Sequence, residues 1–375
     1  MINKYRIRNF KCFEDQELEL GHLNVLTGLN GMGKSSVIQS LLLLKQSFEM
    51  GGTRSMPRLI LNGPLVSIGT RKDALFEGAE KETIGFELTQ LLETSTYEFG
   101  GGANADVMEA IGHSAGDEFV IRRHLSNLFR NEFRYLSTER LGPRTSYPMS
   151  AHEVETKNQL GTRGEYACHY LMHYGKQDIA SALLSHPLAV SDSLGDQVEA
   201  WLGYISPGIR PELQSYSGMD VMNLQYRFAN DGAPTNSYRS TNVGYGITYV
   251  LPLLASLLSA KPDSLLLLEN PEAHLHPRGQ VRIGELIARS AASGCQIIVE
   301  THSDHILNGI RLAVHDDVTN SHDVKLFYFE KIANRLDAIV SPLYIDRDGR
   351  IDPSPDGFFD EFENSLSRLI MPKMD

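Results

Sequence analysis

Cysteine and tryptophan are scarce: the 375 residues contain three cysteines and one tryptophan. Cys12, Cys168 and Cys295 are odd in number and far apart. We therefore expect reduced thiols, and neither a disulfide framework nor a zinc site. This cysteine usage favours a cytoplasmic protein.

Long hydrophobic runs are missing as well. No apolar run approaches the roughly 18 residues of a membrane helix, so we do not expect a membrane protein. The start, MINKYRIRNFKCF, has no apolar signal core, and secretion is not expected. Internal repeats, coiled-coil heptads and low-complexity tracts are also lacking, and the length of the chain allows one large domain or a core with one or two inserts.

Positive charge is in short supply, with 35 lysines and arginines against 47 acidic residues and a net charge of −12. Such a chain is a poor general binder of nucleic acid, because phosphate attraction needs lysine and arginine. The region from 119 to 144 departs from this balance. Its six arginines either form a basic face that contacts DNA or belong to a solvated surface with ion pairs. They are Arg122, Arg123, Arg130, Arg134, Arg140 and Arg144.

The clearest motif is GLNGMGKSS, which fits G-x-x-x-x-G-K-[ST] from Gly28 to Ser35. It follows the short apolar strand LNVLTG and opens an apolar helix, the context that a P-loop requires. The glycines let backbone N–H groups surround a phosphate at the helix N-terminus. Lys34 would reach the β- and γ-phosphates, and the Ser35 hydroxyl would bind Mg²⁺. The predicted phosphate-binding residues are Asn30, Gly31, Met32, Gly33, Lys34, Ser35 and Ser36.

A second acidic feature is LLLLENPEAHLHP, residues 265–277. Glu269 ends a buried apolar strand, where a carboxylate can hold Mg²⁺ beside Ser35. Asn270 follows it, although an amide cannot take a proton from water as a carboxylate can. Glu272 is either the substitute base or a structural or dimer-contact residue.

Two further segments complete the expected site. NVGYGITYVLP places Asn242, Gly244 and Gly246 before a helix, so free N–H groups would point outward from its start. VETHSDHIL follows a strand and offers His302, which is suited to sense a γ-phosphate or has a structural role. Strand, helix and strand in this spacing indicate a parallel α/β unit.

We divide the chain into four segments along these signals. Residues 1–52 form an N-terminal lobe with the P-loop, and 53–235 an inserted β and helical region. Residues 236–322 form a C-terminal lobe, and 323–375 a small segment packed on it. In that last segment, YIDRDGRID holds Asp346, Asp348 and Asp352. We interpret it as a hairpin turn in preference to a metal site.

The order of these motifs resembles the soluble branch of the ABC-type AAA ATPases, which includes the RecF, SMC and OLD proteins. Within that branch, ENPEAHLHPRGQ, VETHSDHILNGIRLAV and DGFFDE are similar to a group of stand-alone bacterial ATPases of the anti-phage type. The resemblance implies an α/β ABC-type head with a mixed sheet, N-terminal antiparallel strands and an inserted helical lobe. It further implies that two heads sandwich ATP and Mg²⁺, with Asn242–Gly246 as the signature loop and His302 as the switch histidine.

Three departures separate the chain from that pattern. Asn270 stands in place of the catalytic glutamate, the signature loop lacks the Ser-Gly-Gly-Gln form, and no Q-loop glutamine can be placed. We therefore expect a slow ATPase that dimerises or oligomerises on ATP and controls a separate effector. By resemblance, that effector would be a nuclease or toxin in antiviral defence. The alternatives are a RecF-like ATPase that acts on DNA and a nucleotide-bound scaffold that does not hydrolyse ATP.

Overall fold

The computed structural model describes residues 1–51, 57–91, 93–111, 126–230, 233–234, 236–331, 335–352, 358 and 361–370. Within these residues, no helix is both long and apolar enough to cross a bilayer.

A central sheet of seven strands runs in the order β18-β17-β16-β3-β15-β14-β8. Its five strands from β16 to β8 are parallel, whereas β17 and β18 are antiparallel, so the sheet is mixed as predicted. The strands are β3 (Leu23–Gly28), β8 (Phe133–Leu136), β14 (Leu265–Glu269), β15 (Gln296–Glu300), β16 (Val324–Glu330), β17 (Ile339–Ile345) and β18 (Ile351–Asp352). Each of the four predicted segments contributes at least one of these strands.

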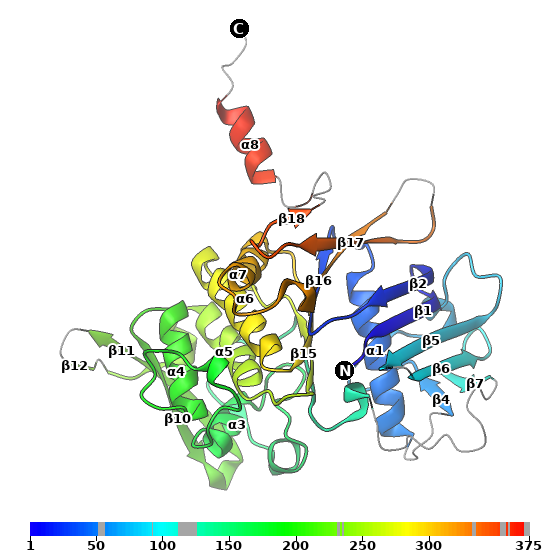
Figure 1. Ribbon diagram of the computed structural model, residues 1–375. Helices are drawn as coiled ribbons and strands as arrows, with labels where there is room; N and C mark the ends of the chain where they lie inside the picture. Colours follow the sequence, from blue (N-terminus) through cyan, green and yellow to red (C-terminus); the bar gives the residue numbers. More distant parts are fainter. Residues whose placement is uncertain are drawn as a thin grey trace.

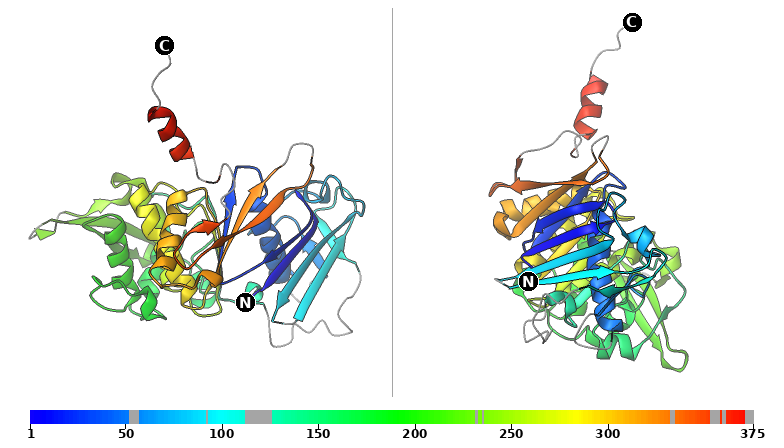
Figure 2. Two further views of the ribbon diagram at one scale, coloured as in Figure 1. Left: turned by 45° about the horizontal axis from the view of Figure 1, so that its top comes forward. Right: turned by 90° about the vertical axis from the view of Figure 1, so that its right-hand side faces the viewer.

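A second, antiparallel sheet has the order β2-β1-β5-β6-β7-β4. Its strands are β1 (Lys4–Phe10), β2 (Phe13–Glu19), β4 (Arg58–Ile60), β5 (Thr83–Gln90), β6 (Glu93–Gly100) and β7 (Val107–Ala110). The opening pair, β1 and β2, confirms the antiparallel start predicted from the alternation of apolar and polar residues. Helix α1 (Lys34–Met50) shares one hydrophobic cluster with this sheet and with one face of the central sheet. Figures 1 and 2 show this sheet and the helical region at opposite ends of the molecule.

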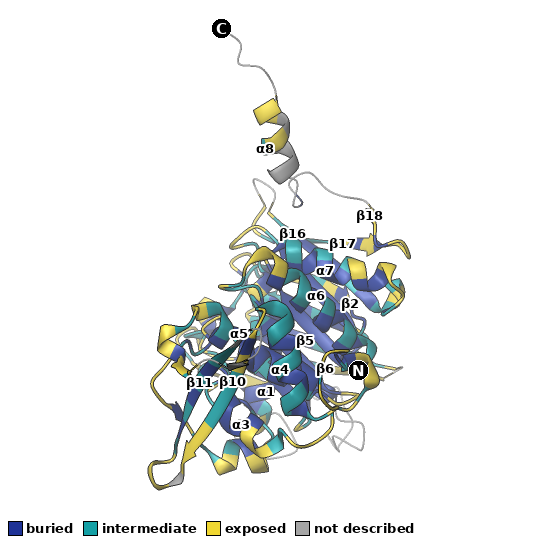
Figure 3. Cartoon of the chain, turned by 90° about the vertical axis from the view of Figure 1, so that its left-hand side faces the viewer, coloured by how far each residue is buried: buried dark blue, intermediate teal, exposed yellow. Residues whose placement is uncertain are grey.

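The other face of the central sheet is covered by helices (Figure 1). They are α3 (Ala167–Tyr174), α4 (Leu194–Ile205), α5 (Tyr245–Leu258), α6 (Pro277–Ala292) and α7 (Asp304–His315). A long hairpin of β10 (Ile209–Tyr216) and β11 (Val221–Asn230) extends beside them, and its far end is exposed (Figure 3). The short elements are α2 (Arg71–Ala74), β9 (Tyr147–Pro148), β12 (Ala233–Pro234), β13 (Tyr238–Arg239) and α8 (Glu361–Ile370).

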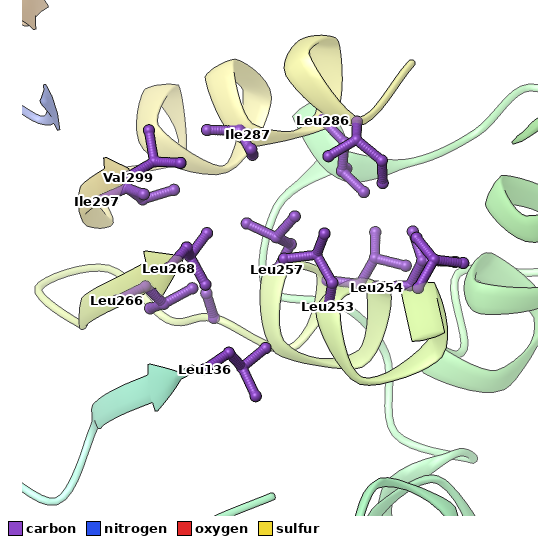
Figure 4. Packing of buried hydrophobic residues seen from close by; sticks show 14 of the residues in the cluster. Leu136, Leu253, Leu254, Leu257, Leu266, Leu268, Leu286, Ile287, Ile297 and Val299 are labelled. Atoms are coloured by element: carbon purple, nitrogen blue, oxygen red, sulfur yellow. The ribbon is translucent and has the colours of Figure 1, made fainter. Parts of the chain in front are cut away.

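Strand β14 is buried on both faces, which explains its unbroken run of leucines. Leu266 and Leu268 pack toward α5 and α6 (Figure 4), and Leu265 and Leu267 pack toward α1. Such a strand cannot shift its register without exposing large side chains to solvent or forcing them into steric clashes. The polar residues that follow it are therefore held firmly at the carboxyl edge of the sheet.

The segment from Asp346 to Arg350 forms the predicted hairpin turn between β17 and β18. The Asp346 N–H donates to the Arg350 carbonyl at 2.8 Å, and Gly349 takes a positive φ of 76°. The carboxylate of Asp346 accepts hydrogen bonds from the Asp348 and Arg350 N–H groups. These contacts assign that carboxylate to the turn.

Candidate functional site

The predicted P-loop lies between β3 and α1, at the carboxyl edge of the central sheet. Gly28, Gly31 and Gly33 have φ values of 130°, 75° and 105°, a region that favours glycine. A Cβ on Gly28 would lie 2.2 Å from the Phe329 carbonyl oxygen, so β16 supports the loop from behind. Lys34 Nζ donates to the Gly28 carbonyl at 2.9 Å and to the Leu29 carbonyl at 2.7 Å. The lysine is therefore folded back onto the loop.

The loop faces a hollow of about 390 Å³. Its size lies within the range of small-molecule sites. Most of the residues predicted for the site line it. They are Asn30, Gly31, Gly33, Lys34, Ser35, Ser36, Asn270 and His302, joined by Cys12, Thr138 and Glu300. Met32 instead packs against the core shared with α1.

Glu300, which ends β15, is the residue that the sequence prediction missed. The Ser35 hydroxyl donates to Glu300 Oε1 at 2.9 Å, and only 6% of Glu300 is exposed. Burial, together with the nearby Glu269, raises the pKa of the Glu300 carboxyl to about 7, although the Ser35 hydrogen bond opposes the shift. The signal was present in the chain, because QIIVE ends in an acid just as LLLLE does.

Glu269 sits one strand farther from the P-loop. Its Oε2 accepts hydrogen bonds from the Thr138 N–H at 3.0 Å and the Thr138 hydroxyl at 3.1 Å. Its backbone carbonyl accepts from Arg140 Nη1 at 2.8 Å. Glu269 thus ends its strand as predicted, with its carboxylate held by the residues that follow β8.

Asn270 has a φ of 44°, the left-handed region that asparagine tolerates better than most side chains. Its N–H donates to the Glu300 carbonyl at 2.9 Å, and its carbonyl accepts from Arg140 Nη2 at 2.6 Å. Its buried Oδ1 has no hydrogen-bond partner among the described residues. Asparagine can therefore adopt this backbone conformation, and it contributes an amide side chain to the lining of the hollow.

Glu272 does not line the hollow. Its Oε2 accepts from the Thr301 hydroxyl at 2.8 Å, and its Oε1 accepts from the His302 N–H at 2.8 Å. Both oxygens are used to hold the loop that carries His302. Burial and the positive charge of Lys34 lower the pKa of the His302 imidazole, which favours its neutral form.

The glycine-rich segment before α5 lies apart from this hollow. Asn242 and Gly244 are exposed, and α5 begins at Tyr245, so Gly246 lies in its first turn. A Cβ on Gly246 would lie 2.2 Å from the His274 carbonyl oxygen, which brings this turn against the HLHP loop. None of the three predicted residues lines the hollow within one chain.

The predicted DNA contact through six arginines is wrong for two of them. Arg134 and Arg140 are each 4% exposed. Arg134 donates to the Ser256 carbonyl and to the Tyr170 hydroxyl, and Arg140 holds the loop after β14. A guanidinium bound inside the protein cannot reach a phosphate backbone. Arg144 is exposed and Arg130 half-buried, whereas Arg122, Arg123 and most of the DGFFDE segment lie outside the described residues.

Three family models match parts of the chain. The model described as "AAA ATPase domain" matches residues 1–140. The model described as "AAA domain, putative AbiEii toxin, Type IV TA system" matches residues 184–308. A family of unknown function, DUF3696, matches residues 320–369.

Two curated relatives are similar at low identity. An OLD nuclease of Thermus scotoductus is 20% identical over 329 residues, which cover 81% of this chain and 59% of that protein. The DNA replication and repair protein RecF of Geobacter sulfurreducens is 29% identical over 147 residues, or 36% of this chain and 40% of RecF. The chain therefore spans about half the length of these relatives.

Solved SMC heads share the fold. An SMC head bound to the C-winged helix domain of ScpA matches with a TM-score of 0.54 at 12% identity, over 92% of this chain and 98% of that one. An SMC head with an extended coiled coil, bound to the C-terminal domain of ScpA derived from Pyrococcus furiosus, also has a TM-score of 0.54, at 11% identity over 98% and 99%. The chain has the α/β fold of these SMC heads, as predicted, and residues 1–140 and 184–308 match models of AAA domains.

Proposed function

We propose that this chain binds ATP with Mg²⁺ at the Gly28–Ser36 loop and acts as a nucleotide switch. The observation that carries the proposal is the hollow itself. A glycine-rich loop with its lysine and serine faces the strand-end acid Glu300, an asparagine and a histidine across one space. This set supplies N–H groups and a cation for phosphates, and oxygen ligands for a hard divalent ion.

The residues fit magnesium because the donors near Ser35 are oxygens and because Glu300 has an oxygen with no partner among the described residues. The ion would be held by the Ser35 hydroxyl and by carboxylates at the ends of β14 and β15. When bound, it would supply positive charge that offsets the charge of the phosphates. Lys34 would leave the loop carbonyls to contact the β- and γ-phosphates.

Hydrolysis is slow in this proposal, because Asn270 occupies the position expected for a general base. Glu272 does not replace it, since both of its carboxylate oxygens bind the Thr301 and His302 loop. Glu272 instead positions His302, whose neutral imidazole lines the hollow. The amide of Asn270 can orient a water molecule but cannot accept its proton.

The switch works through a second copy of the chain. Asn242 and Gly244 before α5 are exposed and do not line their own hollow, so the N–H groups at this helix start are available to the nucleotide of another head. By resemblance, closed heads control a separate effector such as a nuclease or toxin in antiviral defence. The SMC heads that share this fold are bound to domains of a partner protein, ScpA.

The first test is equilibrium binding of ATP and Mg²⁺ by calorimetry. Lys34→Ala should weaken binding by about 10–100-fold, the value of a charged hydrogen bond. The exposed Lys72 on α2 provides the control, and Lys72→Ala should bind as wild type does. Equal affinity of Lys34→Ala and wild type would refute the proposed nucleotide site.

The second test is light scattering with and without ATP. Gly244→Glu places a carboxylate where the other head's phosphates would lie, and its side chain has room because the nearest atom to a Cβ is 3.7 Å away. This variant should bind ATP but remain a monomer. Gly218→Glu, which has open space on the hairpin between β10 and β11, is the matched control and should associate normally. Association of both variants alike would exclude this loop from the contact.

A further inference from the structure

The acid closest to the P-loop in the sheet is Glu300, not Glu269. Strand β15 lies between β3 and β14, so Glu300 pairs in register with Leu26 on one side and with Glu269 on the other. Parallel strands lie about 4.8 Å apart, and Glu269 is thus one strand spacing farther from the loop. Sheet order alone places Glu300 in the inner position.

The contacts of the two acids also indicate that Glu300 is the inner residue. Glu300 Oε1 accepts from the Ser35 hydroxyl, and its Oε2 is buried without a partner among the described residues. His302 Nε2 lies 3.9 Å from Oε1, and Lys34 is bound to loop carbonyls. Glu269 instead uses Oε2 for two hydrogen bonds from Thr138. The inner carboxylate therefore keeps one oxygen without a partner among the described residues, whereas one oxygen of the outer carboxylate is occupied.

A buried carboxylate with an unpartnered oxygen is costly unless a cation or donor joins it. A divalent ion beside Ser35 would remove this cost, because a hydroxyl can give a lone pair to the ion while its proton still goes to Glu300. Two neighbouring strand-end carboxylates also suit one doubly charged ion better than a lone proton.

We propose that Glu300 is the principal carboxylate for the magnesium ion of this site, and that Glu269 lies outside it as a second, weaker partner. The inference rests on the proposed nucleotide function. It assigns to this chain a metal-holding residue on β15 that the P-loop and LLLLE motifs do not include. It also gives Glu300 a role distinct from that of His302, two residues later, which faces the phosphates.

The experiment measures Mn²⁺ binding by electron paramagnetic resonance, with Mn²⁺ as the probe for magnesium and a non-hydrolysable ATP analogue present. Wild type, Glu300→Gln and Glu269→Gln are compared after circular dichroism has verified their folding. Glu300→Gln should weaken Mn²⁺ binding by about tenfold or more, and Glu269→Gln by clearly less, as for an outer residue. The reverse order, or equal losses in both variants, would overturn the assignment.

A second measurement distinguishes a loss of metal binding from a loss of nucleotide binding. The affinity for the ATP analogue is measured with Mg²⁺ and then with EDTA. In wild type, the ATP analogue should bind more tightly with Mg²⁺ than with EDTA. In Glu300→Gln, the affinities measured with Mg²⁺ and with EDTA should be similar. The affinity measured with EDTA should be at least as high in this variant as in wild type. If wild type binds no nucleotide in either condition, the proposed function itself fails. If both variants keep the full response to Mg²⁺, only the role of Glu300 fails.

Glu300→Asp serves if the glutamine variant does not fold. It keeps the charge and shortens the side chain by one methylene, so the carboxylate no longer reaches Ser35 and the ion together. Its Mn²⁺ affinity should fall between those of wild type and Glu300→Gln. Unchanged Mn²⁺ affinity in a folded Glu300→Asp would argue against a direct contact and overturn the proposal.

Discussion

The guanidinium of Arg140 lies over the ring of Tyr249, with 4.6 Å between Cζ and the ring centroid. The backbone N–H of Arg140 donates to the Tyr249 hydroxyl, which donates in turn to the Thr138 carbonyl. The same guanidinium binds the carbonyls of Glu269 and Asn270. Helix α5, whose start is proposed to face another head, is therefore joined through Tyr249 and Arg140 to the loop after β14, where Asn270 lines the hollow.

Removing this guanidinium should destabilise the protein strongly. Arg140→Ala would leave two carbonyls without their donors, and we expect a loss of about 2–4 kcal/mol in the free energy of unfolding. Urea unfolding followed by the emission of Trp201 measures it. Arg144→Ala, four residues later and exposed, should change stability by less than about 0.5 kcal/mol. Similar losses in both variants would show that the Arg140 contacts contribute little.

Restoring a carboxylate at residue 270 should speed hydrolysis. Asn270→Asp tolerates the φ of 44° and supplies a base, and we expect ATP turnover to rise by about tenfold or more. Phosphate release under saturating ATP and Mg²⁺ is the measurement. Asn270→Gly suits the same backbone but supplies no base, and its turnover should not rise. If Asn270→Asp is no faster than wild type, the asparagine is not what limits the reaction.

The stability should fall in mild acid because of His186. Burial, with a smaller contribution from Arg289, lowers the pKa of this imidazole below its ordinary 6.5, and its Nδ1 accepts from the Leu188 N–H. The unfolded chain therefore takes up a proton at a higher pH than the folded protein does. The stabilisation is complete above pH 6.5 and is lost as the pH falls from there toward the lowered value.

Trp201 reports this directly, because the His186 ring packs edge-on against it at 5.1 Å. The urea midpoint seen in tryptophan emission should fall between pH 7.5 and pH 5.5, and His186→Gln should reduce that fall. His152→Gln, at an exposed position, should leave the slope unchanged. The prediction would be wrong if the urea midpoints of wild type and His186→Gln changed equally with pH over this range.

Cys12 should be the thiol that maleimide modifies first, and ATP should protect it. It is half-buried and lines the hollow, whereas Cys168 and Cys295 are buried and have pKa values raised to about 12. At pH 8, ATP at ten times its Kd should slow labelling about tenfold, because labelling then follows the free fraction. Lys34→Ala should lose the protection and Cys12→Ser the label. Labelling that ATP does not slow would place the nucleotide elsewhere.

Local patterns predicted much of this fold and part of the site. GLNGMGKSS and LLLLE are recognisable from a few adjacent residues, so the P-loop and the acid at the end of β14 could be predicted from the sequence alone. The importance of Glu300 could not, because it depends on the order of strands in the sheet. That order brings β15 between β3 and β14, and no local spacing contains it.

The arginines and Glu272 show the same limit. Arg134 and Arg140 lie in an arginine-rich stretch typical of a surface, and their burial depends on acceptors more than 120 residues away, Ser256 and Glu269. Glu272 could be a base or a structural residue until its partners, Thr301 and His302, were known. Hydrogen bonds between distant segments decide such roles, and propensity and periodicity do not report them.

The place of β3 in the sheet has a consequence for the order of events during synthesis. Both neighbours of this strand, β15 and β16, come from residues 296–330, more than 260 positions after Gly28. During synthesis the P-loop therefore leaves the ribosome well before Glu300 in front of it and Phe329 behind it. Contacts at such sequence separation form slowly. The proposed nucleotide site therefore cannot be complete on a nascent chain until the residues of β15 and β16 have also been synthesised.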